Sequence, residues 1–544
     1  MTPGPPQRPV AAEGSIGLYP AANFRITDGR DTDCSAIRQA LWYFSDQTIA
    51  VPRPGLPVAG FARGVNAVDD IAHWAADHAP GTPAAYPPLV WIGSSGELRG
   101  AELAADGASI AADGTTMAFD VVPRIALNRS YCNADSVAYF AGRKLKLRGE
   151  TIEGKFIARS IWPEDFRLGA AAPAPSIAAS GPATPGAIRK LLRTEPSGGA
   201  RSGFAATTLW ERTPGAAGRS EGKPVLAAIL NGAQGDDDEA HGGHFALLTG
   251  RVGAEGAIDD WLVNNFYTLD SFSEKGIVAA IVPLDRYLAD LNSGQAWYRP
   301  SHLVIAILSR ERTASHVQAA LNRVFNQFYR HQLVYRQRTM NCAGISVDAL
   351  RALGWNLHAR GPTSRALAWL GVPWFALRER DLAEARRTFD YFSEDRTRLF
   401  PAAAFEEIAA ALLQLAGGAA GARPTPFEAM LAEDIDALLW LRVPQFPSSR
   451  AWGDFAVVSG REYARRLPRD RSQARIIPVP PRPFPAALLD ADLLPPPAGR
   501  SGLAVALWAA LSVAGLPWLI WRIWRRHRQG AARGVDRSAL FLLL

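Results

Sequence analysis

The stretch "HGGHFALLTG", residues 241–250, decides the fold of this chain, because it places two histidines at the start of a short apolar run. The run that follows His244 has the length of a strand and is too short for an ordinary helix. The sequence therefore predicts a buried strand that begins at His244 and ends at Gly250. Its first side chain, an imidazole, is expected at the end of a sheet.

The run "DDWLVNNFYTL", residues 259–269, predicts a second strand that returns antiparallel to the first. If the hairpin turns near residues 255–256, Asn264 and Asn265 come back opposite residues 246–247. Either amide could then orient the imidazole at the start of the first strand. Both asparagines could equally be residues that only terminate a strand.

The segment "NCAGISVDALRALGW", residues 341–355, predicts a helix that begins near Cys342 and ends at Gly354. The unpaired N–H groups and the positive dipole end of a helix start favour the thiolate form of a cysteine. The same N–H groups can hold an oxyanion, and the side chain of Asn341 is expected to assist them.

A thiolate enzyme also needs a histidine that accepts and returns the proton, and a polar group that holds the ring. We therefore expect Cys342 as the nucleophile, His244 as the general base, and Asn265 or its neighbour Asn264 as the orienting group. The structural alternative is an inert buried cysteine and a histidine that merely ends a strand.

The other two cysteines are weaker candidates. Cys34 lies in "DTDCSAIRQAL", at the start of another predicted helix, whereas Cys132 lies in a segment of loop character. No CxxC spacing occurs, so neither a zinc ribbon nor a disulfide framework is indicated.

A metal site is the main chemical alternative. His241 and His244 form an HxxH pattern, and the acidic run 236–239 directly precedes them, so these side chains could bind a divalent ion. Two glycines separate the histidines and argue against a helix that would turn both rings toward one ion. The acidic run is most simply a solvated loop, and we expect neither a metal nor another cofactor.

The composition is that of a globular protein, with 48% hydrophobic and 20% charged residues in 544. The net charge is +7, but the last 23 residues hold six arginines and one aspartate, which leaves about +2 for the rest. The basic balance therefore belongs to the tail, and no nucleic-acid partner is expected. The arginine-rich, lysine-poor usage indicates a bacterial gene.

The C-terminal part contains "GLAVALWAALSVAGLPWLIW", residues 502–521, which is uncharged and long enough to cross a bilayer. Trp518, Trp521 and Trp524 lie at its end and arginines follow, as at a membrane interface. We expect a single transmembrane helix over 501–524, with the lipid bilayer as a partner and a bacterial inner membrane as the location. The sidedness stays open, because the charge rule places the body outside and no signal peptide is evident.

The patterns together predict an α+β protein of seven consecutive parts. The first three are an N-terminal β-rich mixed region (1–168), an Ala/Pro/Gly-rich linker or insertion (169–222) and a catalytic domain (223–360). The last four are a helical region (361–475), a Pro-rich spacer (476–500), the transmembrane helix (501–524) and an Arg-rich tail (525–544).

A histidine that opens the strand "HFALLTG", followed downstream by "NC" at a helix start, resembles the permuted papain-like hydrolases of the NlpC/P60 superfamily. This branch includes lecithin:retinol acyltransferase-like proteins and bacterial periplasmic relatives. The resemblance covers roughly 223–356 and implies a papain-like fold with Cys342 as nucleophile and His244 as base. The chain departs from the acyltransferases in offering an amide, not a second histidine, at the third position, and in the residues after "NC".

The resemblance implies a membrane-anchored cysteine hydrolase or acyltransferase that acts on an amide or ester. Cell-wall peptide, lipoprotein and lipid acyl groups are the substrates to consider, and the sequence does not choose among them. Two other classes stay open: a non-catalytic membrane-tethered scaffold that keeps the fold, and a metal-dependent hydrolase that uses His241 and His244.

Overall fold

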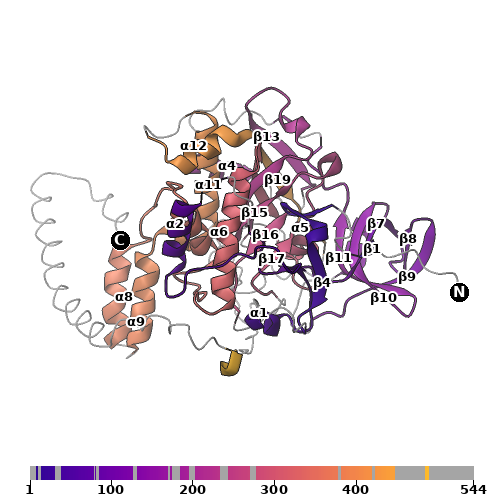
Figure 1. Cartoon of the computed structure of the whole chain (residues 1–544), viewed down its shortest axis with the longest axis horizontal. Coiled ribbons are helices and arrows are strands. Elements are labelled where there is room, and N and C mark those ends of the chain that lie inside the picture. The colour runs from indigo at the N-terminus through magenta and orange to yellow at the C-terminus, as the bar shows by residue number, and fades with distance from the viewer. Residues whose placement is uncertain are drawn as a thin grey trace, which may run out of the picture.

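The computed structural model describes most of the chain as a mixed α+β fold (Figure 1), which confirms the expected class. The described residues are 8–9, 14–30, 38–78, 80, 85–125, 132–169, 172–173, 184–194, 202–232, 243–269, 277–377, 381–418, 423–447 and 484–488.

The centre of the fold is an eight-stranded sheet, in which all pairings except β12–β13 are antiparallel. Its interior strands are buried on both faces, so they read as continuous apolar runs without polar alternation. In spatial order the strands are β12 (Ala172–Pro173), β13 (Ala205–Glu211), β19 (Ile435–Val443), β18 (Ser301–Leu308), β14 (Pro224–Asn231), β15 (His244–Arg251), β16 (Leu262–Asn265) and β17 (Ala280–Pro283).

The predicted hairpin is present in this sheet. The strand β15 begins at His244, a turn follows at η7 (Ala254–Gly256), and β16 returns antiparallel. Asn264 pairs with Leu247, which confirms the expected register. The ladder between β15 and β16 ends at Leu247, so the first residues of β15 pair with β14 alone.

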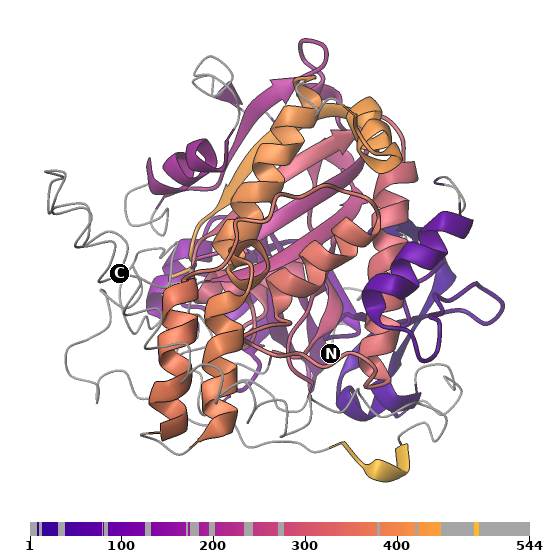
Figure 2. The same ribbon diagram turned by 90° about the vertical axis from the view of Figure 1, so that its left-hand side faces the viewer.

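Helices cover the sheet, and Figure 2 shows them lying across its strands. The helices α6 (Arg312–Tyr329) and α7 (Cys342–Ala352) contact β15, and α11 (Pro401–Ala416) contacts β14, β15 and β19. The remaining helices are α1 (Arg38–Tyr43), α2 (Ala67–Asp77), α3 (Ala134–Phe140), α4 (Pro185–Thr194), α5 (Leu284–Ala289), α8 (Arg365–Leu377), α9 (Leu382–Ser393), α10 (Arg396–Leu399) and α12 (Pro426–Asp434).

A second sheet forms a small barrel at the other end of the molecule from α8 and α9 (Figure 1). The strand β8 pairs with both β9 and β7, which closes five strands on themselves. The strands in order are β1 (Arg8–Pro9), β7 (Gly96–Leu103), β10 (Leu145–Ile152), β11 (Lys155–Pro163), β9 (Thr115–Val121) and β8 (Ser109–Ala112).

Two smaller sheets come from the first hundred residues. One joins β4 (Phe24–Asp28), β5 (Thr48–Pro52) and β6 (Val90–Trp91), and the other joins β2 (Ser15–Ile16) and β3 (Tyr19–Pro20). The strand β6 contacts β17, so this region borders the edge of the main sheet.

The main sheet draws strands from outside the expected catalytic range 223–360. The strand β13 lies in the stretch expected as linker or insertion, and β19 lies in the stretch expected to be helical. The segment "FEAMLAEDIDALLWL" is helical only as far as Asp434 and continues as β19. Leu438 to Leu441 pair with strands on both sides, so sheet pairing outweighs the helical pattern.

The expected transmembrane architecture and membrane location are corrected here. Within the part of the chain that the structure describes, no helix has the length and apolar character needed to cross a bilayer. The segment 501–524 and the tail 525–544 lie outside the described residues. Of the expected spacer 476–500 only 484–488 is described, and its Phe484 stacks on α1, with the ring of Tyr43 at 5.4 Å. We therefore do not retain the membrane anchor.

Candidate active site

The helix α7 begins where the sequence predicts, because Asn341 caps it. The Asn341 side-chain oxygen accepts the N–H groups of Ala343 at 3.1 Å and Gly344 at 3.0 Å. The Asn341 side-chain nitrogen donates to the carbonyls of Gln337 and Leu399, so the cap is pinned to α10. The oxygen of this amide is therefore hydrogen-bonded to the helix start, and its nitrogen is hydrogen-bonded to the two carbonyls that hold the cap in place.

Cys342 is the first residue of α7 and lies against the start of β15. Its side chain is only 3% exposed, and its sulfur accepts the backbone N–H of Phe245, the residue after His244. Burial raises the pKa of the Cys342 thiol, and the N–H groups of Phe245 and Ala343 lower it only in part. The thiol is therefore neutral at rest, although a helix start alone would have favoured the thiolate.

His244 and Asn265 form a direct pair. The His244 Nε2 atom lies 2.7 Å from the Asn265 Oδ1 atom, and Asn265 Nδ2 faces the carbonyl of Val278 at 3.4 Å. Because an amide oxygen only accepts, Nε2 carries the proton and donates it. The His244 Nδ1 atom then keeps its lone pair and can act as a base.

The pKa of His244 is lowered to about 4, first by burial and then by the positive charge of Arg299. The hydrogen bond that His244 donates to Asn265 raises this pKa but is the smaller effect. The imidazole is therefore neutral at neutral pH, as a general base must be.

Asn264 points to the other face of the sheet, because successive residues of a strand alternate. Its side chain joins a buried network with Gln318 on α6, at 3.0 and 3.1 Å, and donates to the carbonyl of Leu247. Gln318 in turn accepts from Thr249 and donates to Asn322. Asn264 thus binds α6 to the sheet, and Asn265 is the neighbour of His244.

Three further side chains gather beside His244, and the sequence patterns do not reveal them. Asn231 of β14 pairs with His244 of β15, and its side chain donates to the hydroxyl of Ser301 at 2.7 Å. Tyr287 of α5 donates to Asn231 Oδ1 at 2.5 Å, and its ring centre lies 6.4 Å from that of His244. Arg299 lies just before β18 and acts electrostatically on His244 and Tyr287.

These three residues come from three separate segments and share no motif or spacing. Among the described residues the thiol of Cys342 and the imidazole of His244 share no hydrogen bond; the link between them runs through the backbone of Phe245. Catalytic hydrogen bonds are often long without substrate and tighten in the complex, so the arrangement is compatible with a dyad.

The other cysteines and the metal candidates separate from this site. Cys132 precedes α3 and is half-buried, and burial raises the pKa of its thiol to about 11. Cys34, His241 and the acidic run 236–239 lie outside the described residues.

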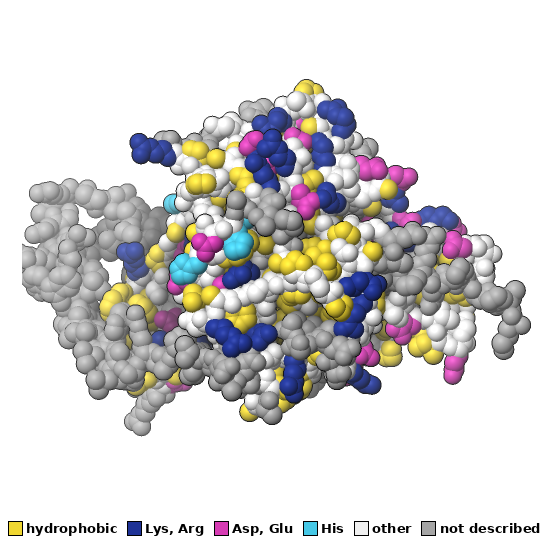
Figure 3. All heavy atoms as spheres, in the orientation of Figure 1, with side chains coloured by type: hydrophobic (Ala, Val, Ile, Leu, Met, Phe, Trp, Pro, Cys, Tyr) yellow, Lys and Arg dark blue, Asp and Glu magenta, His cyan; other side chains and the backbone are white. Residues whose placement is uncertain are grey.

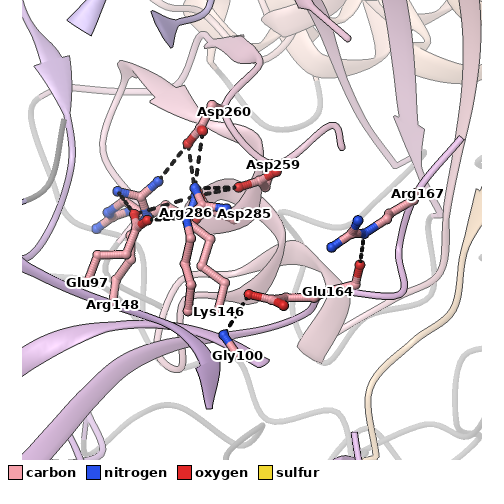
Figure 4. Close-up of polar contacts among 11 residues, drawn as sticks. Glu97, Gly100, Lys146, Arg148, Glu164, Arg167, Asp259, Asp260, Asp285 and Arg286 are labelled. Atoms are coloured by element: carbon pink, nitrogen blue, oxygen red, sulfur yellow. Dashed lines mark hydrogen bonds and ion pairs between the residues drawn. The ribbon is translucent and has the colours of Figure 1, made fainter. Parts of the chain in front are cut away.

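Among the described residues one group of acids is close enough to hold a metal, formed by Asp259, Asp260 and Asp285. The ammonium of Lys146 already occupies its centre, with Nζ at 2.5 Å, 2.9 Å and 2.9 Å from the three carboxylates (Figure 4). Arg148, also from β10, adds contacts to Asp285 at 2.6 Å and Asp260 at 3.0 Å. This cluster is therefore an ion-pair network that joins the barrel to the main sheet, and it leaves no room for a cation.

Charged side chains elsewhere are dispersed: on the face drawn in Figure 3, basic and acidic groups are interspersed with apolar ones. The chain matches no protein-family model, and no curated protein or solved structure matches it.

Proposed function

We propose that this protein is a cysteine-dependent acyl hydrolase or acyltransferase that acts on an amide or ester through Cys342, His244 and Asn265. The observation that carries the proposal is the 2.7 Å hydrogen bond from His244 to Asn265, with the sulfur of Cys342 on the backbone of the next residue, Phe245. A nucleophile at a helix start, a base on the adjacent strand and an orienting amide on the following strand form a thiol triad. The same order along the chain is what the resemblance to permuted papain-like hydrolases implies.

The proposed reaction has two steps. First, His244 Nδ1 takes the proton of the Cys342 thiol while the sulfur bonds to the substrate carbonyl carbon. The bond from that carbon to the leaving group then breaks, and the leaving group receives the proton from His244. In the second step water or another acyl acceptor gives its proton to His244 and attacks the thioester, which releases the acyl product and restores the thiol.

The oxyanion of each tetrahedral intermediate needs a donor close to the sulfur. The backbone N–H of Cys342 has no acceptor among the described residues, because Asn341 caps the two residues that follow it. We assign this N–H as the oxyanion donor. Asn341 then acts by fixing the helix start and not by contact with the oxyanion.

Because the Cys342 thiol and the His244 imidazole are both neutral at rest, the substrate must carry a reactive carbonyl group. A buried neutral thiol is a weak nucleophile, so the attack depends on removal of its proton by His244 as the carbonyl carbon arrives. An activated acyl group is therefore a better first probe than a general alkylating reagent, which selects for thiolates.

Acylation by a small activated ester, read by mass spectrometry of the intact protein and its peptides, tests the proposal. We expect Cys342 to acylate at least about 100-fold faster than Cys132, and His244→Ala to remove most of that difference. Cys132→Ala is the matched control, since it deletes the other described thiol, which is half-buried and precedes α3. It should leave the acylation of Cys342 unchanged.

Two outcomes would contradict the proposal. Equally slow acylation of Cys342 and Cys132 would favour the non-catalytic scaffold. Acylation or turnover that requires a metal and stops with a chelator would favour the metal-dependent alternative. A circular dichroism spectrum of each variant checks that the fold is intact.

A further inference from the structure

Arg299 is a buried cation without a carboxylate partner. Its side chain is 3% exposed, its Nε donates to Gln295 at 3.0 Å, and its Nη1 donates to the carbonyl of Gly232 at 3.3 Å. No ion pair joins it to any acid within the described part of the chain. A buried charge that is solvated only by neutral oxygens costs folding free energy, and an anion that binds beside it recovers that cost.

The sheet brings this guanidinium to the candidate active site. His244, Asn231 and Ser301 form one row across three neighbouring strands, since Asn231 pairs with both of the others. Arg299 precedes Ser301 by two residues, and the N–H of Gly232 donates to the carbonyl of Pro300 at 3.0 Å. The end of β14 and the start of β18 are thereby fastened together beside the start of β15.

We propose that Arg299 is a specificity residue that binds an anionic group, a carboxylate or a phosphate, on the leaving-group side of the acyl substrate. The planar guanidinium matches either anion and can donate two hydrogen bonds to it. This inference rests on the proposed acyl-transfer function, because that function identifies the ligand as a substrate.

The position of Arg299 favours the leaving group over the oxyanion. Its Nη1 atom donates to the carbonyl of Gly232, the residue after Asn231, and Asn231 is the strand partner of His244. The guanidinium therefore lies on the β14 side of the imidazole, and its positive charge lowers the pKa of His244. The oxyanion must form next to the sulfur, but the leaving group must approach His244 to receive its proton. An anion held by Arg299 would place the leaving group on that side.

Three matched thioesters test the inference. They share one butanoyl group and differ in the thiol that leaves: 3-mercaptopropionate, its carboxamide, and 2-mercaptoethyl phosphate. For the protein as it exists we expect kcat/KM for the carboxylate or the phosphate to exceed that for the carboxamide by about 10- to 100-fold. The better of the two anionic thioesters identifies the source of the anion in the substrate.

The substitution Arg299→Gln should reduce the ratio of anionic to neutral substrate to about 1. Arg299→Lys, which keeps the charge but loses the planar fork, should retain part of the ratio and serves if the glutamine variant does not fold. A merely structural role would lower the rates for all three thioesters by the same factor, which would overturn the inference.

A second measurement does not depend on turnover. Inorganic phosphate should bind in a saturable way in isothermal titration calorimetry, and Arg299→Gln should abolish this binding. If Cys342 acylates but neither the ratio nor the phosphate binding appears, the anion site is wrong and the thiol function stands. If Cys342 never acylates but phosphate still binds through Arg299, the thiol function is wrong and the anion site stands.

Discussion

Two buried polar clusters of this protein differ in one respect, which is how their charges are compensated. At the boundary between barrel and main sheet, Lys146 and Arg148 face several carboxylates at hydrogen-bond distance (Figure 4). At the start of β15 the groups are a thiol, an imidazole and neutral amides, and the cation Arg299 has no acid beside it among the described residues.

The difference shows how the same burial produces different properties. In the ion-pair cluster the charges fix each other: Lys146 and Arg148 hold the pKa of Glu97 down to about 2, although burial alone would raise it. In the candidate site burial outweighs the hydrogen bonds that oppose it, so the pKa of the thiol rises and that of the imidazole falls. The ion pairs of Lys146 and Arg148 join two parts of the fold, whereas the charge of Arg299, unpaired among the described residues, is available to the anionic group that we propose it binds.

The largest expected effect comes from removing the positive charge of Lys146, which balances the carboxylates around it. Lys146→Met leaves four carboxylates around an apolar side chain, and we expect the free energy of unfolding to fall by about 3–5 kcal/mol in urea titrations. Lys155→Met is the matched control, since Lys155 also lies in the barrel but forms an exposed pair with Asp120, and it should cost less than about 1 kcal/mol. Equal losses for the two lysines would contradict the assigned role of the cluster.

The second comparison separates two neighbouring asparagines. Asn265→Ala removes the acceptor that fixes the His244 ring, so we expect kcat/KM for thioester cleavage to fall by about 10- to 100-fold with a small change in stability. Asn264→Ala instead removes two hydrogen bonds to Gln318 from the buried network and should lower the free energy of unfolding by about 1–3 kcal/mol. If Asn264→Ala gives the larger loss of rate per folded molecule, the assignment of the orienting amide is wrong.

The smallest expected effect is a displacement of the pH profile. Since the pKa of His244 is about 4, kcat/KM should fall only as the pH drops toward that value, well below the ordinary histidine range. Arg299→Gln removes one of the two causes and should move this acidic limb upward. An acidic limb near pH 6.5 in the unmodified protein would contradict the burial of the imidazole.

The same group makes a contribution to stability whose sign follows from linkage. In the unfolded chain the imidazole binds a proton below about pH 6.5, but in the folded protein only below about 4. The unfolded state therefore binds more protons in this window, and the free energy of unfolding should decrease as the pH falls from about 6.5 to 4.

Local patterns in the sequence were enough to predict the elements that carry the proposed triad. The apolar run after His244, the turn near 255–256 and the cap at Asn341 specify a strand, a hairpin and a helix start through contacts between residues close along the chain. The register that pairs Asn264 with Leu247 follows from the length of the hairpin. For that reason the sequence alone could point to the proposed nucleophile, the proposed base and the pair of candidate amides.

What only the tertiary structure decided depends on residues far apart in the chain. Both faces of β15 and β16 are buried, so no polar alternation in the sequence distinguishes the face of Asn264 from that of Asn265. The strand β19 enters the sheet through pairing with β13 and β18, against a helical pattern of its own.

The electrostatics of the site also arise only in three dimensions. A helix start predicts an acidic thiol, but the packing of α7 against β15 buries Cys342 and reverses the direction of its pKa. Arg299 belongs to no motif and is brought beside His244 by the order of strands β18, β14 and β15. The sequence determined which chemical groups occupy the start of each element, and the sheet determined which of them meet and how much water they keep.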